Sequence, residues 1–213
     1  YQFEESTEPV PSVENGGKQI RQIGSYKYIN PLLECDVAEG TIDAIKKSFN
    51  NELDVFVAEA KAKHDLTNVA VYYRDLNNGP TFGVGPNEKF FPASLLKVPI
   101  MMAFYHWSEV KPDLFDSSIP YEQPKDLGFQ QTIIPREQMI VGQTYTVREL
   151  LERMIRYSDN QALFLLSSRL PLDMLENLFK TIGVDDSVLH DSEAKLTVKE
   201  YSGFFRMLFN GSY

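Results

Sequence analysis

Apolar residues recur at every third or fourth position between Thr41 and His64. The positions concerned are Ile42, Ile45, Phe49, Leu53, Phe56 and Ala60. In an α-helix this spacing gathers the apolar side chains on one face. The pattern therefore predicts a long amphipathic helix.

Two short runs of β-branched and aromatic residues follow this predicted helix. They are Val69–Arg74 and Thr81–Val84, and the pair Asn78-Gly79 between them is typical of a tight turn. These features predict an antiparallel hairpin. A sheet of only two strands is marginally stable, so we expect further strands from sequence beyond this chain or from a second polypeptide.

Helical patterns return after the hairpin. Residues 94–107 form a nearly continuous apolar run of helix length, whereas residues 112–144 contain four prolines and predict irregular structure. A further helix is expected after Asp159. Another is expected from about Pro171 to Gly183, because proline favours a helix start and glycine favours a helix end.

Two capping boxes mark further helix starts. Thr146 with Glu149 opens the run TVRELLERMIRY, and Thr197 with Glu200 opens a last helix that ends near Phe209. The predicted order is a helix, a hairpin and then several helices. We therefore expect an α+β fold with an antiparallel sheet flanked by helices and a separate helical lobe.

The first 28 residues differ from the rest in composition. They are rich in Glu, Pro and Gly and have no apolar periodicity. Such a segment cannot bury enough apolar surface to fold alone, so residues 1–28 are expected to be a polar linker or disordered tail. Residues 29–213 are expected to form one domain.

Charge and ligand spacing exclude several classes of function. The formal net charge is −9, which disfavours nucleic acid and anionic membranes as partners, since both are bound by basic surfaces. Cys35 is the single cysteine, so no internal disulfide is possible. His64, His106 and His190 lack metal-ligand spacing, and we expect no metal and no cofactor.

Ser94 and Lys97 stand out within the apolar run FFPASLLKVPIMMAFYHW, residues 90–107. Residues three apart share one helix face, so the two side chains can touch. A serine hydroxyl needs a base to become a nucleophile, and burial favours the neutral, basic form of a lysine. The helix start beside Ser94 would also help to stabilise an anion. The alternative is a helix-capping serine followed by a lysine that extends to solvent.

A second polar motif, Ser158-Asp159-Asn160, lies between two apolar segments in MIRYSDNQALFLL. By itself this motif is compatible with a simple helix break and N-cap. In combination with S-x-x-K, however, S-D-N belongs to the signature of class A β-lactamases and penicillin-binding proteins.

On these two motifs and their surroundings the chain resembles the penicillin-recognising serine hydrolases, most closely the class A β-lactamase-like group. The resemblance runs from about Thr41 to Tyr213. It implies that Ser94 is the acylated nucleophile and Lys97 its base partner. It further implies that Ser158 relays a proton to the leaving nitrogen and that Asn160 orients Lys97 and binds the substrate amide.

The third motif of the family, K-[ST]-G, is absent from the chain. FKTIG at residues 179–183 comes near to it, but Ile182 replaces the glycine. In the family this motif sits on a strand that binds the substrate carboxylate. We therefore expect the domain to be incomplete at its C-terminal end, with the remaining strands supplied by downstream sequence or by a second polypeptide.

The deacylating glutamate of the family is also altered. Class A β-lactamases carry E-x-x-L-N after S-D-N, and this chain has EAKLT, with Glu193 first and Thr197 in place of the asparagine. Glu193 is thus a candidate catalytic residue that activates water. The alternative is a solvated acidic residue before a helix, in which case the acyl-enzyme would persist.

Two functions remain open at this stage. The first is a serine acyl-transfer hydrolase that attacks β-lactams or D-alanyl cell-wall peptides through Ser94. The second is a non-catalytic relative that serves as a binding or scaffolding module. The resemblance also implies an exported protein, located outside the cell, in the periplasm or on an outward-facing membrane anchor.

Overall fold

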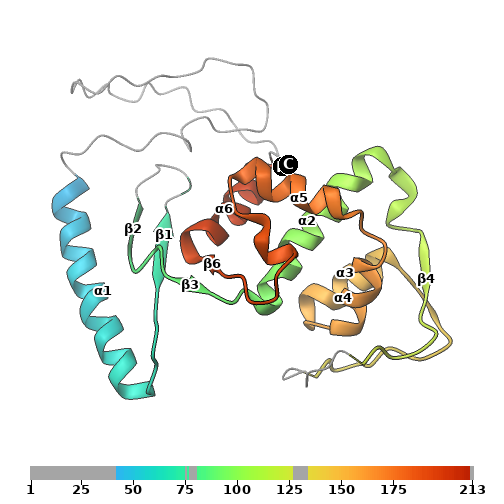
Figure 1. Cartoon of the computed structure of the whole chain (residues 1–213), viewed down its shortest axis with the longest axis horizontal. Helices are drawn as coiled ribbons and strands as arrows, with labels where there is room; N and C mark the ends of the chain where they lie inside the picture. The colour runs from blue at the N-terminus through green and yellow to red at the C-terminus, as the bar shows by residue number, and fades with distance from the viewer. Residues whose placement is uncertain (1–41, 75, 77–80, 127–133, 212–213) are drawn as a thin grey trace, which may run out of the picture.

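The computed structural model describes residues 42–74, 76, 81–126 and 134–211 (Figure 1). The predicted tail at residues 1–28 and the predicted turn pair Asn78-Gly79 lie outside this part of the chain. Within it, helices predominate and the strands are short and antiparallel. The predicted α+β class is confirmed.

The long N-terminal helix and the hairpin are both confirmed. The elements are α1 (Ile42–His64), β1 (Val71–Arg74) and β2 (Thr81–Val84), and β1 pairs antiparallel with β2 from Val71 opposite Val84 to Arg74 opposite Thr81. Helix α1 packs along β2, where the rings of Phe49 and Phe82 have centroids 5.1 Å apart. Figure 1 shows this unit at the left of the molecule.

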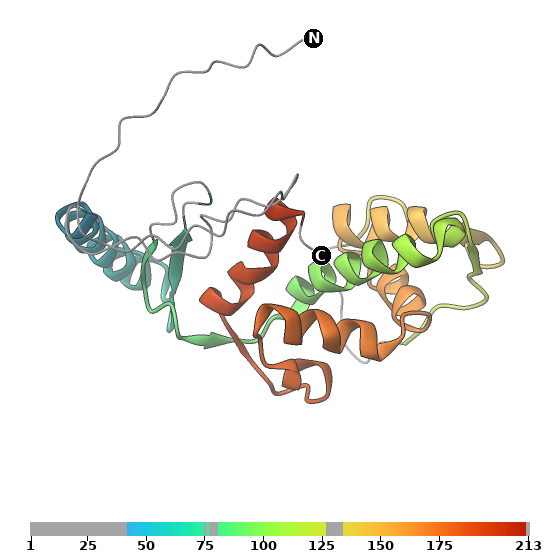
Figure 2. The ribbon, with the colours of Figure 1, turned by 90° about the horizontal axis from the view of Figure 1, so that it is seen from above.

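The remaining helices gather around α2, as Figures 1 and 2 show. They are α2 (Lys97–Val110), α3 (Val147–Arg156), α4 (Asn160–Ser167), α5 (Leu172–Ile182) and α6 (Val198–Asn210). Their inward faces form one apolar core. Its largest fully buried side chains include Phe104, Phe179, Phe204, Leu150 and Met154. This helical part holds both motifs of the candidate site.

Both predicted capping boxes are present. Thr146 accepts a hydrogen bond from the Glu149 amide at the start of α3, and Thr197 accepts one from the Glu200 amide at the start of α6. In each case the glutamate side chain accepts a hydrogen bond from the backbone amide of the capping threonine. Helix α5 ends at Gly183, whose φ is 70°. The helix end predicted at this glycine is therefore confirmed.

The structure departs from the sequence-based expectation in the short connections. Residues 93–96 form a 3-10 turn before α2, and 3-10 turns also occur at Pro112–Leu114 and Asp186–Leu189. Four short strands pair across long sequence separations. They are β3 (Lys89–Phe90) with β6 (Leu196–Thr197), and β4 (Ser118–Pro120) with β5 (Thr144–Thr146). The segment 112–144 is therefore less irregular than predicted.

Candidate active site

Ser94 lies in the 3-10 turn that leads directly into α2. Ala93 before it has a φ of 44°, and the Leu95 amide donates to the Pro92 carbonyl at 2.8 Å. The hydroxyl of Tyr201, on α6, donates to the Leu95 carbonyl at 3.0 Å. The turn is thus fixed from two sides, while Ser94 itself is exposed.

Lys97 occupies the first turn of α2 and is only 4 % exposed. Its Nζ atom lies 3.2 Å from the hydroxyl oxygen of Ser94, 2.7 Å from that of Ser158 and 2.7 Å from Asn160 Oδ1. The carbonyl oxygen of Ser158 is 2.8 Å away. Four acceptors therefore surround a group that has at most three hydrogens to donate. This arrangement holds the amine of Lys97 against the Ser94 hydroxyl.

Burial lowers the pKa of Lys97 from its usual value of 10.5. The negative charge of Asp159 acts in the opposite direction and is the smaller effect. A lowered pKa increases the neutral fraction of the amine, and only the neutral amine can accept a proton. The Ser158 hydroxyl lies 3.2 Å from the Ser94 hydroxyl. Two hydroxyls and one amine thus form a closed path along which a proton can move.

The turn between α3 and α4 presents Ser158 and Asn160 to this amine. Ser158 has a φ of 53°, in the left-handed region that residues other than glycine seldom adopt. Asp159 Oδ1 caps α4 by accepting from the amides of Gln161 at 2.9 Å and Ala162 at 3.2 Å. The left-handed conformation of Ser158 costs about 1–3 kcal/mol. Contacts from the neighbouring residues must therefore hold it in place.

Asp159 pairs with Arg153 behind this turn. Asp159 Oδ2 lies 3.1 Å from Arg153 Nε, and the two side chains are only 4 % and 13 % exposed. Arg153 was not among the residues predicted from the sequence to form the site. The only signal for Arg153 is an arginine on the last turn of an amphipathic helix, six positions before an aspartate, which is too common a pattern to single it out.

The candidate residue Glu193 is not brought into this cluster by any hydrogen bond. It lies in an exposed turn, where its amide donates to Asp191 Oδ1 at 2.9 Å. Two residues later, the ammonium of Lys195 lies 4.5 Å from the ring centroid of Phe91. The turn is therefore anchored near the Ser94 turn, but in the described part of the chain no hydrogen bond or ion pair holds the Glu193 carboxylate.

Thr197, which replaces the asparagine of E-x-x-L-N, has a clear local role. It is 7 % exposed and serves as the N-cap of α6, where its side chain accepts from the Glu200 amide at 3.0 Å. Its backbone also pairs with Lys89 in the β3–β6 ladder. A threonine therefore satisfies the start of α6 here, in keeping with the capping preference for short polar side chains.

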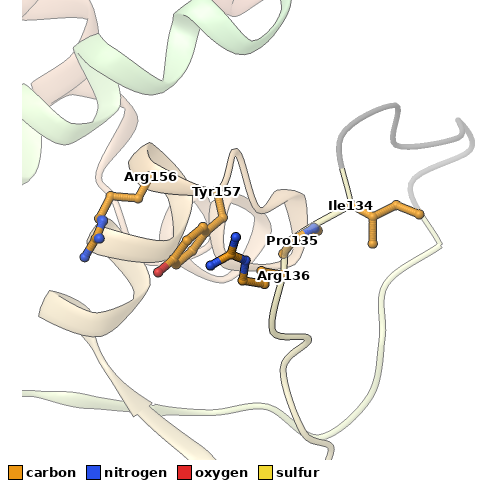
Figure 3. Close-up of a pocket in the computed structure, with 5 residues that line it drawn as sticks. All are labelled: Ile134, Pro135, Arg136, Arg156 and Tyr157. Carbon is orange, nitrogen blue, oxygen red and sulfur yellow. The ribbon is translucent and has the colours of Figure 1, made fainter.

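A surface hollow lies next to the S-D-N turn (Figure 3). It is lined by Ile134, Pro135, Arg136, Arg156 and Tyr157. Arg156 pairs with Glu152 on the same helix. None of the candidate site residues lines this hollow, although Tyr157 directly precedes Ser158.

Among residues 42–74, 76, 81–126 and 134–211, no group of three or more His, Cys, Asp or Glu side chains is arranged to hold a metal ion. Within the same residues, no helix combines the length and the apolar character needed to cross a membrane.

Comparisons with solved structures show a shared fold. Among solved structures, a variant of the last common ancestor of class A β-lactamases of Gram-negative bacteria is 24 % identical, with a TM-score of 0.60, and the match covers 75 % of this chain and 63 % of that one. A β-lactamase from Francisella tularensis is 20 % identical, with a TM-score of 0.58 and coverage of 75 % and 63 %.

A third solved structure is a mutant of PBP-A in an acyl-enzyme complex with penicillin G. It is 19 % identical, with a TM-score of 0.55 and coverage of 78 % of this chain and 63 % of that one. The chain thus spans 63 % of the length of these solved relatives. At these identities the likeness shows the shared fold. No curated protein sequence matches the chain.

The family model described as the beta-lactamase enzyme family matches residues 48–213. This match covers most of the chain and includes Ser94, Lys97, Ser158 and Asn160. The chain belongs to the beta-lactamase enzyme family.

Proposed function

We propose that the protein is a serine acyl-transfer hydrolase that acts on β-lactams or on D-alanyl peptides of the cell wall. One observation carries this proposal: the buried amine of Lys97 lies 3.2 Å from the exposed hydroxyl of Ser94. Burial lowers the pKa of a lysine and so increases the fraction of neutral amine that can accept a proton. An exposed serine beside such a base can reach a carbonyl group that enters from solvent.

In the acylation step, Lys97 accepts the hydroxyl proton of Ser94 as the serine oxygen bonds to the substrate carbonyl carbon. The carbon–nitrogen bond of the amide then breaks, and the nitrogen takes up a proton through the hydroxyl of Ser158. This hydroxyl is 2.7 Å from Lys97 Nζ and 3.2 Å from Ser94 Oγ, so it can pass the proton from the lysine to the leaving nitrogen. Asn160 Oδ1 holds the amine in place at 2.7 Å. The product is an ester between Ser94 and the acyl group.

We further propose that this ester is long-lived. Hydrolysis requires a base that activates water, and Glu193 is the candidate for that role. Its carboxylate is exposed, and no hydrogen bond holds it within the described residues. An unpositioned base contributes little to catalysis, because proton abstraction needs a base within hydrogen-bond reach of the water. The protein would then behave as a penicillin-binding protein or a slow hydrolase.

The compartment and partners are part of the same proposal. A substrate drawn from the cell wall places the protein outside the cytoplasm, either exported freely or held on an outward-facing anchor. No metal, cofactor or nucleic acid is needed for the acyl transfer described here. The strand that would carry K-[ST]-G, whether from downstream sequence or from a second polypeptide, stays a prediction.

The test is intact-protein mass spectrometry after mixing with benzylpenicillin, alongside Ser94→Ala and Ser108→Ala. Ser108 is the matched control because it is a serine near the C-terminal end of the same helix, where its hydroxyl donates to the Tyr105 carbonyl. The same measurement would be made on a longer chain that includes any sequence following Tyr213. We expect one adduct in the unmodified protein and in Ser108→Ala, and none in Ser94→Ala.

Each other outcome has a distinct meaning. Rapid loss of penicillin without an adduct, abolished in Ser94→Ala, would indicate a true β-lactamase and restore a role for Glu193. The catalytic proposal would be wrong if the protein and its longer form both gave neither adduct nor turnover, with penicillin and with peptide esters. The non-catalytic binding module would then be the better description.

A further inference from the structure

Arg153 holds the S-D-N turn by both its main chain and its side chain. Its carbonyl oxygen accepts hydrogen bonds from the amides of Tyr157 at 3.1 Å and Asp159 at 3.3 Å. Its Nε atom lies 3.1 Å from Asp159 Oδ2. The left-handed residue Ser158 lies between these two anchored amides. The turn that presents Ser158 to Lys97 is therefore fixed to the end of α3 through this one residue.

The same guanidinium also reaches the segment between β4 and β5. It donates through Nη2 to the Glu137 carbonyl and lies 5.8 Å from the ring centroid of Tyr145 on β5. The residues just before Glu137 form one wall of the hollow in Figure 3. Arg153 thus joins the S-D-N turn to this wall, and its own side chain is only 13 % exposed.

The charges along this chain of contacts alternate. Asp159 acts on Lys97, where its negative charge favours the ammonium form. Arg153 pairs with the same carboxylate at 3.1 Å, and its positive charge offsets the negative charge of Asp159. The phenol of Tyr121 also lies near the Asp159 carboxylate, and the phenol of Tyr145 lies near Tyr121 and Arg153. Lys195 and the Tyr201 phenol are the ionisable groups that contact the residues around the Ser94 turn.

We propose that Arg153 is a positioning residue of this site: by pairing with Asp159 it keeps the S-D-N turn on Lys97 and screens Lys97 from the carboxylate. Arg153 touches none of the reacting atoms, so it acts through Asp159. The inference rests on the proposed function of Ser94 and Lys97 and adds a residue that neither S-x-x-K nor S-D-N contains.

A purely structural ion pair and this positioning role lead to different results. Loss of a structural pair would lower stability and slow acylation to the same extent at every pH. Loss of a positioning charge would leave Asp159 facing Lys97 alone, so the pKa of Lys97 would rise and acylation would need a higher pH. The pH profile therefore separates the two roles.

The experiment follows the titration of Lys97 by NMR, with lysine labelled at the ε-carbon and the signal assigned from Lys97→Met. It compares the unmodified protein with Arg153→Gln, Arg153→Lys and Arg148→Gln. Arg148 is a matched control on the same helix, since it is 64 % exposed and its pair with Asp116 is at the surface, at 3.6 Å. The rate of Ser94 acylation by a fluorescent penicillin is measured over the same pH range.

We expect the midpoint of Lys97 and the acid limb of acylation to move together to higher pH in Arg153→Gln. At pH 7 acylation should be about tenfold slower, the lower end of the effect of one unbalanced neighbouring charge. Arg153→Lys restores the charge and should restore the midpoint, and Arg148→Gln should leave both unchanged. An unmoved Lys97 midpoint in folded Arg153→Gln would overturn the proposal.

A second variant covers the case in which Arg153→Gln does not fold. Asp159→Asn removes the carboxylate but leaves the guanidinium, so the midpoint of Lys97 should move to lower pH, and an unmoved midpoint would again overturn the proposal. The Lys97 titration needs no substrate. If penicillin failed to acylate Ser94, the proposed function would fall while this measurement still decided the role of Arg153.

Discussion

The amine of Lys97 lies 2.7 Å from the amide oxygen of Asn160, a residue 63 positions later in the chain. This contact joins the start of α2 to the start of α4. A lysine so deeply buried would be costly if it had no partners, and the amide oxygen supplies one without adding a negative charge. The pair thus keeps the amine in place and leaves its pKa lowered by burial.

The first prediction concerns the pH dependence of acylation. The pKa of Lys97 is lowered by burial. The acylation rate should therefore increase with pH as the amine loses its proton, with a midpoint below 10.5. Lys97→Met should abolish this increase and slow acylation by about 10²- to 10⁴-fold, the usual contribution of a general base. The measurement is the rate of penicillin acylation from pH 5 to pH 10.

Lys111→Met is the control for that prediction, because Lys111 follows the end of the same helix and its ammonium lies exposed over Trp107. Its profile should match that of the unmodified protein. If the acylation rate of Lys97→Met still increased with pH in the same way, a group other than Lys97 would cause the pH dependence.

The second prediction concerns the contact between α6 and the Ser94 turn. Tyr201→Phe removes the hydrogen bond to the Leu95 carbonyl. The free energy of unfolding should fall by about 1 kcal/mol, the typical value of one such bond, and acylation should slow because Ser94 precedes Leu95. Burial raises the pKa of Tyr201 to about 12, so this loss should be constant between pH 6 and pH 9.

Tyr105→Phe is the matched control, since Tyr105 is 56 % exposed on α2. Denaturant titration and penicillin labelling should show little change in this variant. Equal effects in both variants would mean that the phenol of Tyr201 acts through general packing alone.

The third prediction concerns Glu193 and the lifetime of the acyl-enzyme. Glu193→Gln should leave the rate of adduct loss nearly unchanged, because the carboxylate is exposed and not held by a hydrogen bond. A working base would instead contribute about 10²- to 10⁴-fold. The lifetime is read from mass spectra taken after free penicillin is removed, with Glu109→Gln as an exposed control.

The fourth prediction tests the start of α3, the helix that leads to the S-D-N turn. Thr146→Ala removes a capping side chain and should lower the free energy of unfolding by about 1 kcal/mol. Thr181→Ala is the control, because its hydroxyl bonds back to the Asn177 carbonyl within α5 and caps nothing. Thermal and denaturant unfolding followed by circular dichroism would measure both. Equal losses would show that the cap contributes no more than any exposed threonine.

The elements that could be predicted from sequence are those fixed by neighbouring residues. The capping boxes at Thr146 and Thr197 formed as predicted, since each depends on a residue three positions away. The hairpin strands followed from β-branched and aromatic residues. The ladder of Lys89 with Thr197 was missed because so short a pairing depends on contacts made by the whole fold.

The site shows the same division. The proximity of Ser94 and Lys97 followed from helix geometry, whereas their proximity to Ser158 and Asn160 was inferred only from the family resemblance. The left-handed conformation of Ser158 had no sequence signal, because a serine gives no reason to expect it. The roles assigned to these residues, and to Glu193, await the experiments described above.

The site residues come from segments far apart in the chain, so the site depends on the docking of separate helices. One helical turn brings Ser94 to Lys97, but Ser158 is 64 positions from Ser94 and reaches it only when α3 and α4 dock on α2. A brief sub-global opening of that docked pair would leave the nucleophile in place and remove its proton path. Penicillin labelling should therefore be lost when denaturant undocks α3 and α4 in a large fraction of molecules, even where α2 is still folded.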